Sequence, residues 1–359
     1  MNNNRILYLD VARILAVASM VMLHVPVDWP PPLVPSSEWQ AVNVYTSLTR
    51  FCVPLFVMIS GALFLQPDKA ISLKRLYGKN ILRLVTAFIF WSIIYAALTT
   101  YWPLNVPKTA PASGIKALAA FAHKVASGHA HMWFLYMIVG LYMIVPFLKK
   151  ITADKKLTEY FLLLAFVFAL VVPGLSTIPA LAEPLKTAVG EQRMNFYFVM
   201  GYSFYFVGGF YLHHYTLSPA KKYGVYLLGG TSLLFTFFMS NYISIRAGRR
   251  IDLWYGNLLP QTAMTTLAIF IFLRDNVSKI QFREKTVEHI LTASKYSFGI
   301  YLVHALFLYV CTAYKIDRVL TPNVHAIITI PLYAVIVFAC CYATSAILNR
   351  IPILNRYIV

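Results

Sequence analysis

Long apolar stretches recur along the whole chain, separated by short polar segments. Each holds about 20 mostly apolar residues, enough for a helix that rises 1.5 Å per residue to cross the hydrocarbon core of a bilayer. The pattern predicts an all-α, polytopic membrane helical bundle of about ten transmembrane helices. The predicted spans are 6–25, 43–66, 80–102, 131–148, 158–174, 195–212, 223–243, 256–273, 296–314 and 326–348.

The composition agrees with a membrane protein. Hydrophobic residues make up 59% of the chain and charged residues 12%, with a mean hydropathy of +0.65, whereas soluble domains are roughly one-quarter charged. The spans leave no room for a soluble domain of useful size, so we expect residues 1–359 to form a single integral-membrane domain. Asp10 and Arg13 interrupt the first apolar stretch, and no small-residue cleavage site follows it, so we expect a retained helix instead of a signal peptide.

The basic residues predict the orientation of the chain. Although the net charge is +18, the lysines and arginines fall in short loops and form no long basic arm, so nucleic acid is not the expected partner. Counted on alternate sides of the ten spans, eighteen lie on one side and ten on the other, with three arginines inside or at the edge of spans. The positive-inside rule then places both termini in the cytoplasm, with the cluster Arg246, Arg249 and Arg250 as the main exception. We expect a multi-pass protein of the bacterial inner membrane.

A few ionisable residues lie within the apolar spans. A charge at membrane depth costs several kcal/mol, so such residues mark candidate functional sites. They are Asp10, Arg13 and His24 in the first span, Arg50 in the second and His304 in the ninth.

The first span places its polar residues on one face. Arg13 and His24 are eleven positions apart, which is three helical turns plus about 20° and a separation of roughly 16 Å. Asp10 precedes Arg13 by three residues, close enough to neutralise it. One groove would hold both Arg13 and His24. The structural alternative is that Asp10 and Arg13 pair only to lower the cost of insertion, while His24 reaches the outer interface.

The other candidates also have structural alternatives. Arg50 is either a functional cation or a packing cation held by backbone carbonyls. For Ser60, next to Gly61, a close helix contact is favoured over a nucleophile. His304 is either part of a site or a core histidine that donates to a backbone carbonyl.

Two further candidates open the fourth span. Trp133 is equally explained as an interfacial anchor, whereas His131 is less easily assigned to anchoring. The loop histidines lack the His-x-x-x-His spacing of a metal site, so we predict no metal. The sequence also lacks a Gly-rich phosphate loop and a Gly-x-Ser-x-Gly elbow.

Four motifs in order resemble the membrane acyltransferase family three, whose members modify bacterial glycans, lipids and antibiotics. Ten residues separate the arginine from the histidine in the first motif, as in that family. The motifs are Leu9-Asp10-Val11-Ala12-Arg13 through His24, the run from Arg50 to Gly61, His131-Met132-Trp133-Phe134-Leu135, and the run from Tyr296 to His304.

The resemblance implies that acetyl-CoA is the co-substrate and that a glycan or lipid-linked saccharide is the acceptor. It also implies that Arg13 and His24 are essential. We hypothesise that the donor docks from the cytoplasm and sends its pantetheine arm past Arg13, because positive charge at the mouth suits a polyanion. The cations expected near its phosphates are Lys74, Arg75, Lys79 and Arg83.

The same residues suggest a chemical mechanism. A histidine with its ordinary pKa of about 6.5 suits a general base, and His24 is the candidate. Arg50, together with His131, would stabilise the oxyanion of the tetrahedral intermediate. Trp133 or Trp254 would stack on a sugar ring. Direct transfer and a covalent acyl-histidine relay are both consistent with the sequence.

Three alternatives differ from acetyl transfer. A transporter or flippase for a lipid-linked sugar would also place charges at the midplane, but we find no internal repeat of the kind such proteins carry. A glycan O-succinyltransferase would need an extra cation near the thioester, from Arg193 or the cluster Arg246, Arg249 and Arg250. A purely structural scaffold would bury arginines at great cost. The sequence identifies neither the acceptor nor the oligomeric state.

Overall fold

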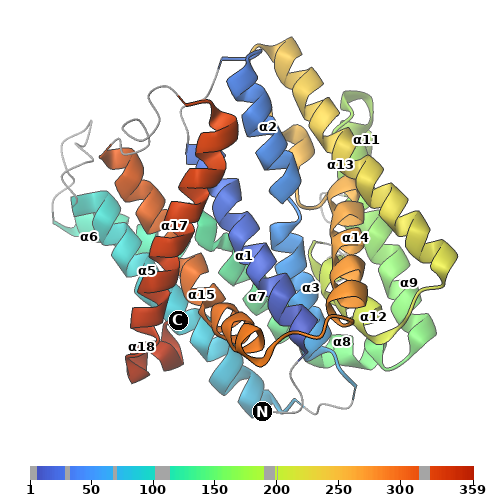
Figure 1. Cartoon of the computed structure of the whole chain (residues 1–359), viewed down its shortest axis with the longest axis horizontal. Helices are drawn as coiled ribbons and strands as arrows, with labels where there is room; N and C mark the ends of the chain where they lie inside the picture. The colour runs from blue at the N-terminus through green and yellow to red at the C-terminus, as the bar shows by residue number, and fades with distance from the viewer. Residues whose placement is uncertain are drawn as a thin grey trace. The chain divides into compact units, whose positions relative to one another are not determined.

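The computed structural model describes residues 6–28, 33–67, 71–101, 114–189, 199, 201–314 and 324–359. These residues form helices joined by turns, and none of them is in a strand (Figure 1). Within them, eight helical segments are long and apolar enough to cross a membrane, and a ninth candidate is a helix pair broken at Ile144. The predicted polytopic all-α class is confirmed.

The sixth predicted span, residues 195–212, lies partly outside the described residues, which exclude 190–198 and 200. Its later part is helical and belongs to α12 (Ser203–His214). The other nine predicted spans each coincide with one of the nine candidates.

The chain divides into two compact units, each assembled from separate stretches of sequence. Unit 1 comprises Met1–Ala70, Ile144–Lys295 and Asn323–Ala334, and unit 2 comprises Ile71–Met143, Tyr296–Pro322 and Val335–Val359. Two long helices, α15 (Glu284–Ala313) and α17 (Ala326–Leu348), contribute to both. That all 359 residues act as one domain stays a prediction.

Unit 1 is centred on α1, which packs against α2, α3 and α14, while α13 packs along α14 (Figure 1). Standard signals set several helix ends. Ser36 caps α2 by accepting a hydrogen bond from Trp39 N at 3.1 Å, and Gly248 ends α13 in the left-handed conformation. The helices of unit 1 are α1 (Leu7–Asp28), α2 (Ser37–Thr49), α3 (Cys52–Phe64), α8 (Val145–Thr152), α9 (Lys155–Ala165), η3 (Phe166–Val171), α10 (Val172–Leu175), α11 (Pro179–Val189), α12, α13 (Pro219–Ala247), η4 (Leu253–Tyr255), α14 (Pro260–Val277) and the first parts of α15 and α17.

Two glycines bring α3 and α12 into backbone contact. A Cβ atom at Gly61 would lie 1.7 Å from the carbonyl oxygen of Phe206, and one at Gly209 would lie 2.1 Å from that of Met58. No other residue fits at these separations, and small residues mediate such helix contacts in membranes. The close helix contact predicted at Ser60 and Gly61 is therefore confirmed.

Two predicted spans are broken. In the second, α2 ends at Thr49 and α3 begins at Cys52, so Arg50 lies in the interruption. In the fourth, the helix breaks at Ile144, where Pro146 lacks the amide hydrogen that would continue the hydrogen-bond ladder. Hydropathy alone predicted continuous helices at both places.

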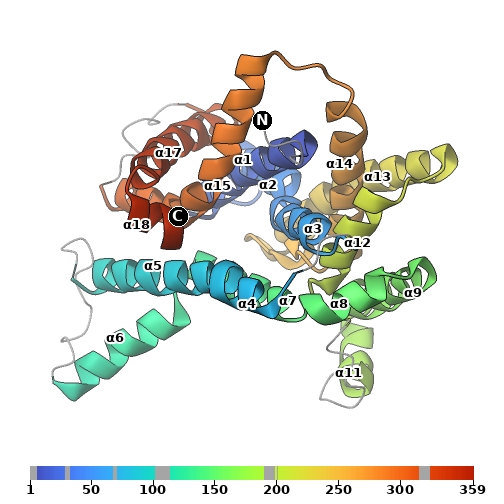
Figure 2. The ribbon, with the colours of Figure 1, turned by 90° about the horizontal axis from the view of Figure 1, so that it is seen from below.

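Unit 2 is arranged around α5, which packs against α6, α7 and α18 (Figure 2). Side chains of α5 hold the end of the chain: Thr86 Oγ1 donates to Tyr357 O at 2.6 Å and Trp91 Nε1 to Ile358 O at 3.4 Å. The helices of unit 2 are α4 (Leu73–Arg75), the π-helix η1 (Leu76–Ile81), α5 (Leu82–Tyr101), α6 (Ile115–Ser127), η2 (Ala130–Met132), α7 (Trp133–Met143), the later parts of α15 and α17, and α18 (Pro352–Tyr357).

Candidate active site

In unit 1, Ser294 joins the two charged residues of α1. Arg13 Nη1 lies 3.7 Å from Asp10 Oδ1, as the three-residue spacing predicts. The hydroxyl of Ser294 donates to Asp10 Oδ1 at 2.5 Å and accepts from Arg13 Nη1 at 3.1 Å. Asp10 is buried. The three groups fix the direction of the Arg13 side chain.

His24 lies on the same helix as Arg13 and is half-buried. Two residues later, the carbonyl oxygen of Pro26 accepts a hydrogen bond from Arg250 Nη1 at 3.3 Å. Arg13 and His24 therefore share one continuous helix, as the predicted common face requires, and Arg250 reaches α1 close to His24.

Arg50 occupies the break between α2 and α3. Its guanidinium lies 4.8 Å from the ring centroid of Tyr255, and its buried Nε has no hydrogen-bond partner among the described residues. The guanidinium of Arg250 lies 6.0 Å from the same ring, and the Tyr255 hydroxyl donates to Asn43 Oδ1. A tyrosine ring attracts cations through its negative face. Tyr255 thus holds Arg50 while leaving hydrogen-bond donors available to a ligand.

The two arginines at Tyr255 differ in their charge balance. Arg250 Nε donates to Asp252 at 2.7 Å. Arg50 forms no ion pair with a carboxylate of the described residues. An uncompensated guanidinium suits a site where negative charge develops.

Three histidines gather in unit 2. His304 is fully buried, and its Nδ1 lies 2.6 Å from Tyr301 O. Because a carbonyl oxygen only accepts, Nδ1 of the neutral ring carries the hydrogen and Nε2 is the basic nitrogen. The ring of buried His131 lies 4.9 Å from that of His304, and His131 Nδ1 lies 2.9 Å from His129 Nδ1. The carbonyl contact expected for a core His304 is present, and it leaves a basic nitrogen on the ring.

Trp133, from the third motif, and Ser60, from the second, are less buried than His131 and His304. Trp133 is exposed and contacts the ring of Phe134 edge-on. This exposure suits both interfacial anchoring and sugar stacking. Ser60 is half-buried on α3, beside the glycine contact.

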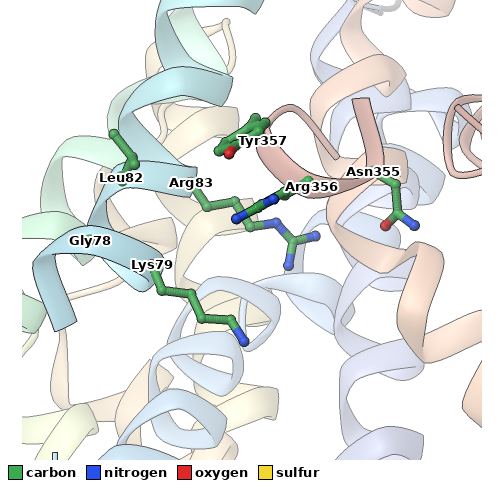
Figure 3. Close-up of a pocket in the computed structure, with 7 residues that line it drawn as sticks. All are labelled: Gly78, Lys79, Leu82, Arg83, Asn355, Arg356 and Tyr357. Carbon is green, nitrogen blue, oxygen red and sulfur yellow. The ribbon is translucent and has the colours of Figure 1, made fainter. Parts of the chain in front are cut away.

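A cavity of about 530 Å³ in unit 2 is lined by two of the four predicted donor cations. Lys79 and Arg83 reach into it from η1 and α5, and Arg356 reaches toward the same space from α18 (Figure 3). Arg83 also faces the ring of Phe298 at 5.4 Å and donates through Nη2 to Val359 O. The cavity is lined by Gly78, Lys79, Leu82, Arg83, Asn355, Arg356 and Tyr357.

The remaining two predicted donor cations do not line this cavity. Lys74 and Arg75 lie in α4, one turn before η1, and both are exposed. Lys79 and Arg83 are four residues apart, so they share one side of the helical segment. The site predicted from four cations therefore consists of two of them together with residues of α18.

The comparisons with known proteins identify the family. The sequence model of one protein family, Acyl_transf_3, described as an acyltransferase domain, matches residues 6–346. The chain belongs to this acyltransferase family. With its membrane-spanning helices, it is a membrane acyltransferase. No curated protein and no solved structure matches the chain.

For this acyltransferase, the structure adds residues that the sequence patterns did not indicate. Ser294, Tyr255 and Arg356 are distant in sequence from the residues they accompany, so no spacing rule could have found them. His129 had a weak local signal, since it stands two positions before His131. Among the described residues, no group of three or more His, Cys, Asp or Glu side chains has the geometry to hold a metal ion.

Proposed function

We propose that this acyltransferase moves an acetyl group from cytoplasmic acetyl-CoA across the bacterial inner membrane to a hydroxyl of an extracytoplasmic or lipid-linked glycan. Both termini lie in the cytoplasm in this proposal, as the loop charges indicate. Within the family, we propose that the chain acts like the O-acetyltransferase of enterobacterial common antigen, whose acceptor is a glycan. Membrane lipids surround the bundle, and no nucleic acid takes part.

The observation that carries the proposal is the cation-lined cavity of unit 2. Members of an acyltransferase family need an acyl donor, and CoA is a polyanion with phosphates at one end. Lys79 and Arg83 offer it charge-assisted hydrogen bonds. Lys74 and Arg75 precede the cavity-lining residues in the sequence, and both are exposed. Their charges attract the donor over a longer range.

The chemical step assigns one role to each polar group. His24 takes the proton of the sugar hydroxyl, and the hydroxyl oxygen attacks the thioester carbonyl carbon. Arg50 stabilises the resulting oxyanion, a role for which His131 is the second candidate. The carbon–sulfur bond then breaks, and the CoA thiolate takes the proton from His24. The products are the sugar ester and CoA with a free thiol. Arg13, held by Asp10 and Ser294, orients the donor arm.

A succinyl donor would need a cation for its second carboxylate, and the members of the outer cluster of Arg246, Arg249 and Arg250 differ in this respect. Arg250 is bound to Asp252 and Arg246 donates to the Tyr242 hydroxyl at 2.9 Å, whereas Arg249 is exposed and forms no ion pair among the described residues. Arg193, the other predicted partner of such a carboxylate, lies outside the described residues.

The test is release of the CoA thiol from acetyl-CoA by the reconstituted protein. Native protein should release CoA, whereas His24→Ala and Arg13→Ala should not, although both remain folded. His123→Ala, at an exposed position of α6, is the matched control and should act like the native chain. If native protein neither turns over nor binds any acyl-CoA, the donor assignment is wrong and a lipid-linked sugar transporter becomes the better hypothesis. Mass analysis for acyl-His24 separates a covalent relay from direct transfer.

A further inference from the structure

The helix α18 forms one wall of the donor cavity but lies beyond the family match. The match ends at residue 346, whereas α18 spans Pro352–Tyr357. Hydrogen bonds from Thr86 and Trp91 of α5 hold the residues that end and follow α18. The family match therefore gives no information on α18, although these hydrogen bonds attach α18 to α5, the helix that carries Arg83.

Three consecutive residues of α18 bring different recognition groups to the cavity. Asn355 offers an amide that both donates and accepts, which is the pairing that suits the edge of adenine. Arg356 offers a planar guanidinium that binds phosphate through two donors. Tyr357 offers an aromatic ring on which a base can stack. An amide, a guanidinium and an aromatic ring together match a phosphorylated adenosine.

The guanidinium of Arg356 is available and already oriented. It lies 5.2 Å from the ring centroid of Tyr357, and it forms no ion pair with a carboxylate of the described residues. No acidic residue lines the cavity, whereas Lys79, Arg83 and Arg356 all do (Figure 3). Three cations without a carboxylate among the lining residues favour a ligand with several negative charges.

We infer that α18 recognises the 3′-phosphoadenosine end of CoA, with Arg356 bound to the 3′-phosphate and with Asn355 and Tyr357 against the adenine. This inference rests on the proposed use of acyl-CoA. Lys79 and Arg83, on the opposite wall, then bind the 5′-diphosphate. The 3′-phosphate distinguishes CoA from other adenosine diphosphates, so Arg356 is a specificity-determining residue.

The experiment compares acetyl-CoA with 3′-dephospho-acetyl-CoA on the full-length protein in lipid nanodiscs. Native protein should show a KM for the dephosphorylated donor that is roughly tenfold higher, because one charge-assisted contact is lost. Arg356→Gln should raise the KM for acetyl-CoA by a similar factor and leave the KM for the dephosphorylated donor unchanged. The kcat should change little, because Arg356 is far from the acyl group in this arrangement.

Two control variants separate recognition from folding. Arg350→Gln removes an exposed cation that does not line the cavity and should preserve the native ratio of KM values. Arg356→Lys keeps the charge and should retain part of the discrimination. The inference would be overturned if Arg356→Gln kept the native ratio of the two KM values. Equal KM values for the two donors in native protein would overturn it as well.

A binding measurement distinguishes failure of this inference from failure of the proposed function. CoA without an acyl group should raise the unfolding temperature of native protein more than dephospho-CoA does. If CoA binds in this way but acetyl transfer is absent, the proposed acetyl transfer fails and the recognition by α18 stands. If acetyl transfer occurs and CoA and dephospho-CoA stabilise the protein equally, the inference about α18 fails alone.

Discussion

The two compact units differ sharply in how their charges are balanced. Of the 13 Asp and Glu residues in the chain, twelve fall in unit 1 and one, Asp317, falls in unit 2, whereas the 31 Lys and Arg residues divide into 20 and 11. Asp317 lies outside the described residues. Several cations of unit 1 are paired, as in Asp252 with Arg250 at 2.7 Å and Asp275 with Lys222 at 2.8 Å, and Arg50 is an exception. The described part of unit 2 holds no acidic side chain.

We propose that this difference separates charges that serve the fold from charges that serve a ligand. A cation that is already bound to a carboxylate, such as Arg13 beside Asp10, is held in place by the protein itself. Cations that share a cavity without a carboxylate repel one another, and this repulsion is relieved when a polyanion binds. We therefore associate the unit 1 centre with positioning and the unit 2 cavity with donor binding.

The largest expected effect is loss of stability when the unit 1 pair is broken. Asp10→Asn removes the charge that accepts the Ser294 hydrogen bond and lies beside Arg13, and loss of a hydrogen bond to a charged group costs about 1.5–3 kcal/mol. Unfolding followed by intrinsic fluorescence in detergent should show this loss. Asp154→Asn is the control, because Asp154 caps α9 at an exposed position and asparagine caps equally well. If the two variants unfold alike, Asp10 does not hold the unit 1 centre.

The next effect concerns the backbone contact of α3 and α12 in unit 1. Gly209→Ala would place a methyl group 2.1 Å from Met58 O, and overpacking of this kind costs about 1–3 kcal/mol. Gly208→Ala is the neighbouring control, since its methyl group would meet Leu162 at an ordinary 3.8 Å. We expect a lower melting temperature for Gly209→Ala only. Equal melting temperatures would mean that the helices separate without cost.

A smaller effect is expected at Tyr255, where unit 1 holds an uncompensated arginine. Tyr255→Leu removes the aromatic face beneath Arg50 and should lower kcat roughly tenfold, since a desolvated cation–π contact is worth up to about 2 kcal/mol. Tyr255→Phe keeps the ring and loses only the contacts of the hydroxyl, such as its hydrogen bond to Asn43, so turnover should stay within about twofold of native. If the Tyr255→Phe and Tyr255→Leu variants have the same kcat, the Tyr255 ring does not position Arg50.

The smallest effect is a pH dependence at the histidines of unit 2. His129 precedes the fourth span, and burial lowers its pKa from the ordinary 6.5. It is therefore neutral at pH 7, shares a hydrogen with His131 and stacks on Tyr95. Since the pKa is lower in the folded state, the contribution to stability is full above pH 6.5 and is lost as the pH falls through the folded value.

This pH dependence is measured by melting native protein and His129→Asn between pH 8 and 5. The native chain should lose more stability on acidification than the variant, so that the melting temperatures of the two proteins converge as the pH falls. Parallel curves would contradict the assigned protonation of His129.

Local features of the site could be predicted from sequence, while long-range ones could not. The Asp10–Arg13 contact follows from helical spacing, and the close contact at Gly61 follows from the absence of a side chain. The serine that bridges Asp10 and Arg13 lies 281 residues from Arg13, and no periodicity relates the two positions. The place of Arg356 in the donor cavity could not be predicted either, because Arg356 reaches the cavity only through the packing of α18 on α5.

The helix breaks were missed because hydropathy measures how apolar a segment is and carries no information on its hydrogen-bond ladder. The break at Arg50 lies inside the segment Ser37–Phe64, which is long and apolar enough to cross a membrane. Pro146 was a visible signal for the break at Ile144, but proline is also tolerated within membrane helices.

Titration calorimetry of CoA into the purified full-length protein tests the central claim most directly, namely that the cations lining the unit 2 cavity bind the acyl donor. The account predicts saturable binding that weakens as salt screens the phosphates, and that weakens further in Lys79→Gln at every salt concentration. Lys124→Gln, an exposed change on α6 outside the cavity, should bind as native does. Absence of binding, or binding that is indifferent to both salt and Lys79, would contradict the account.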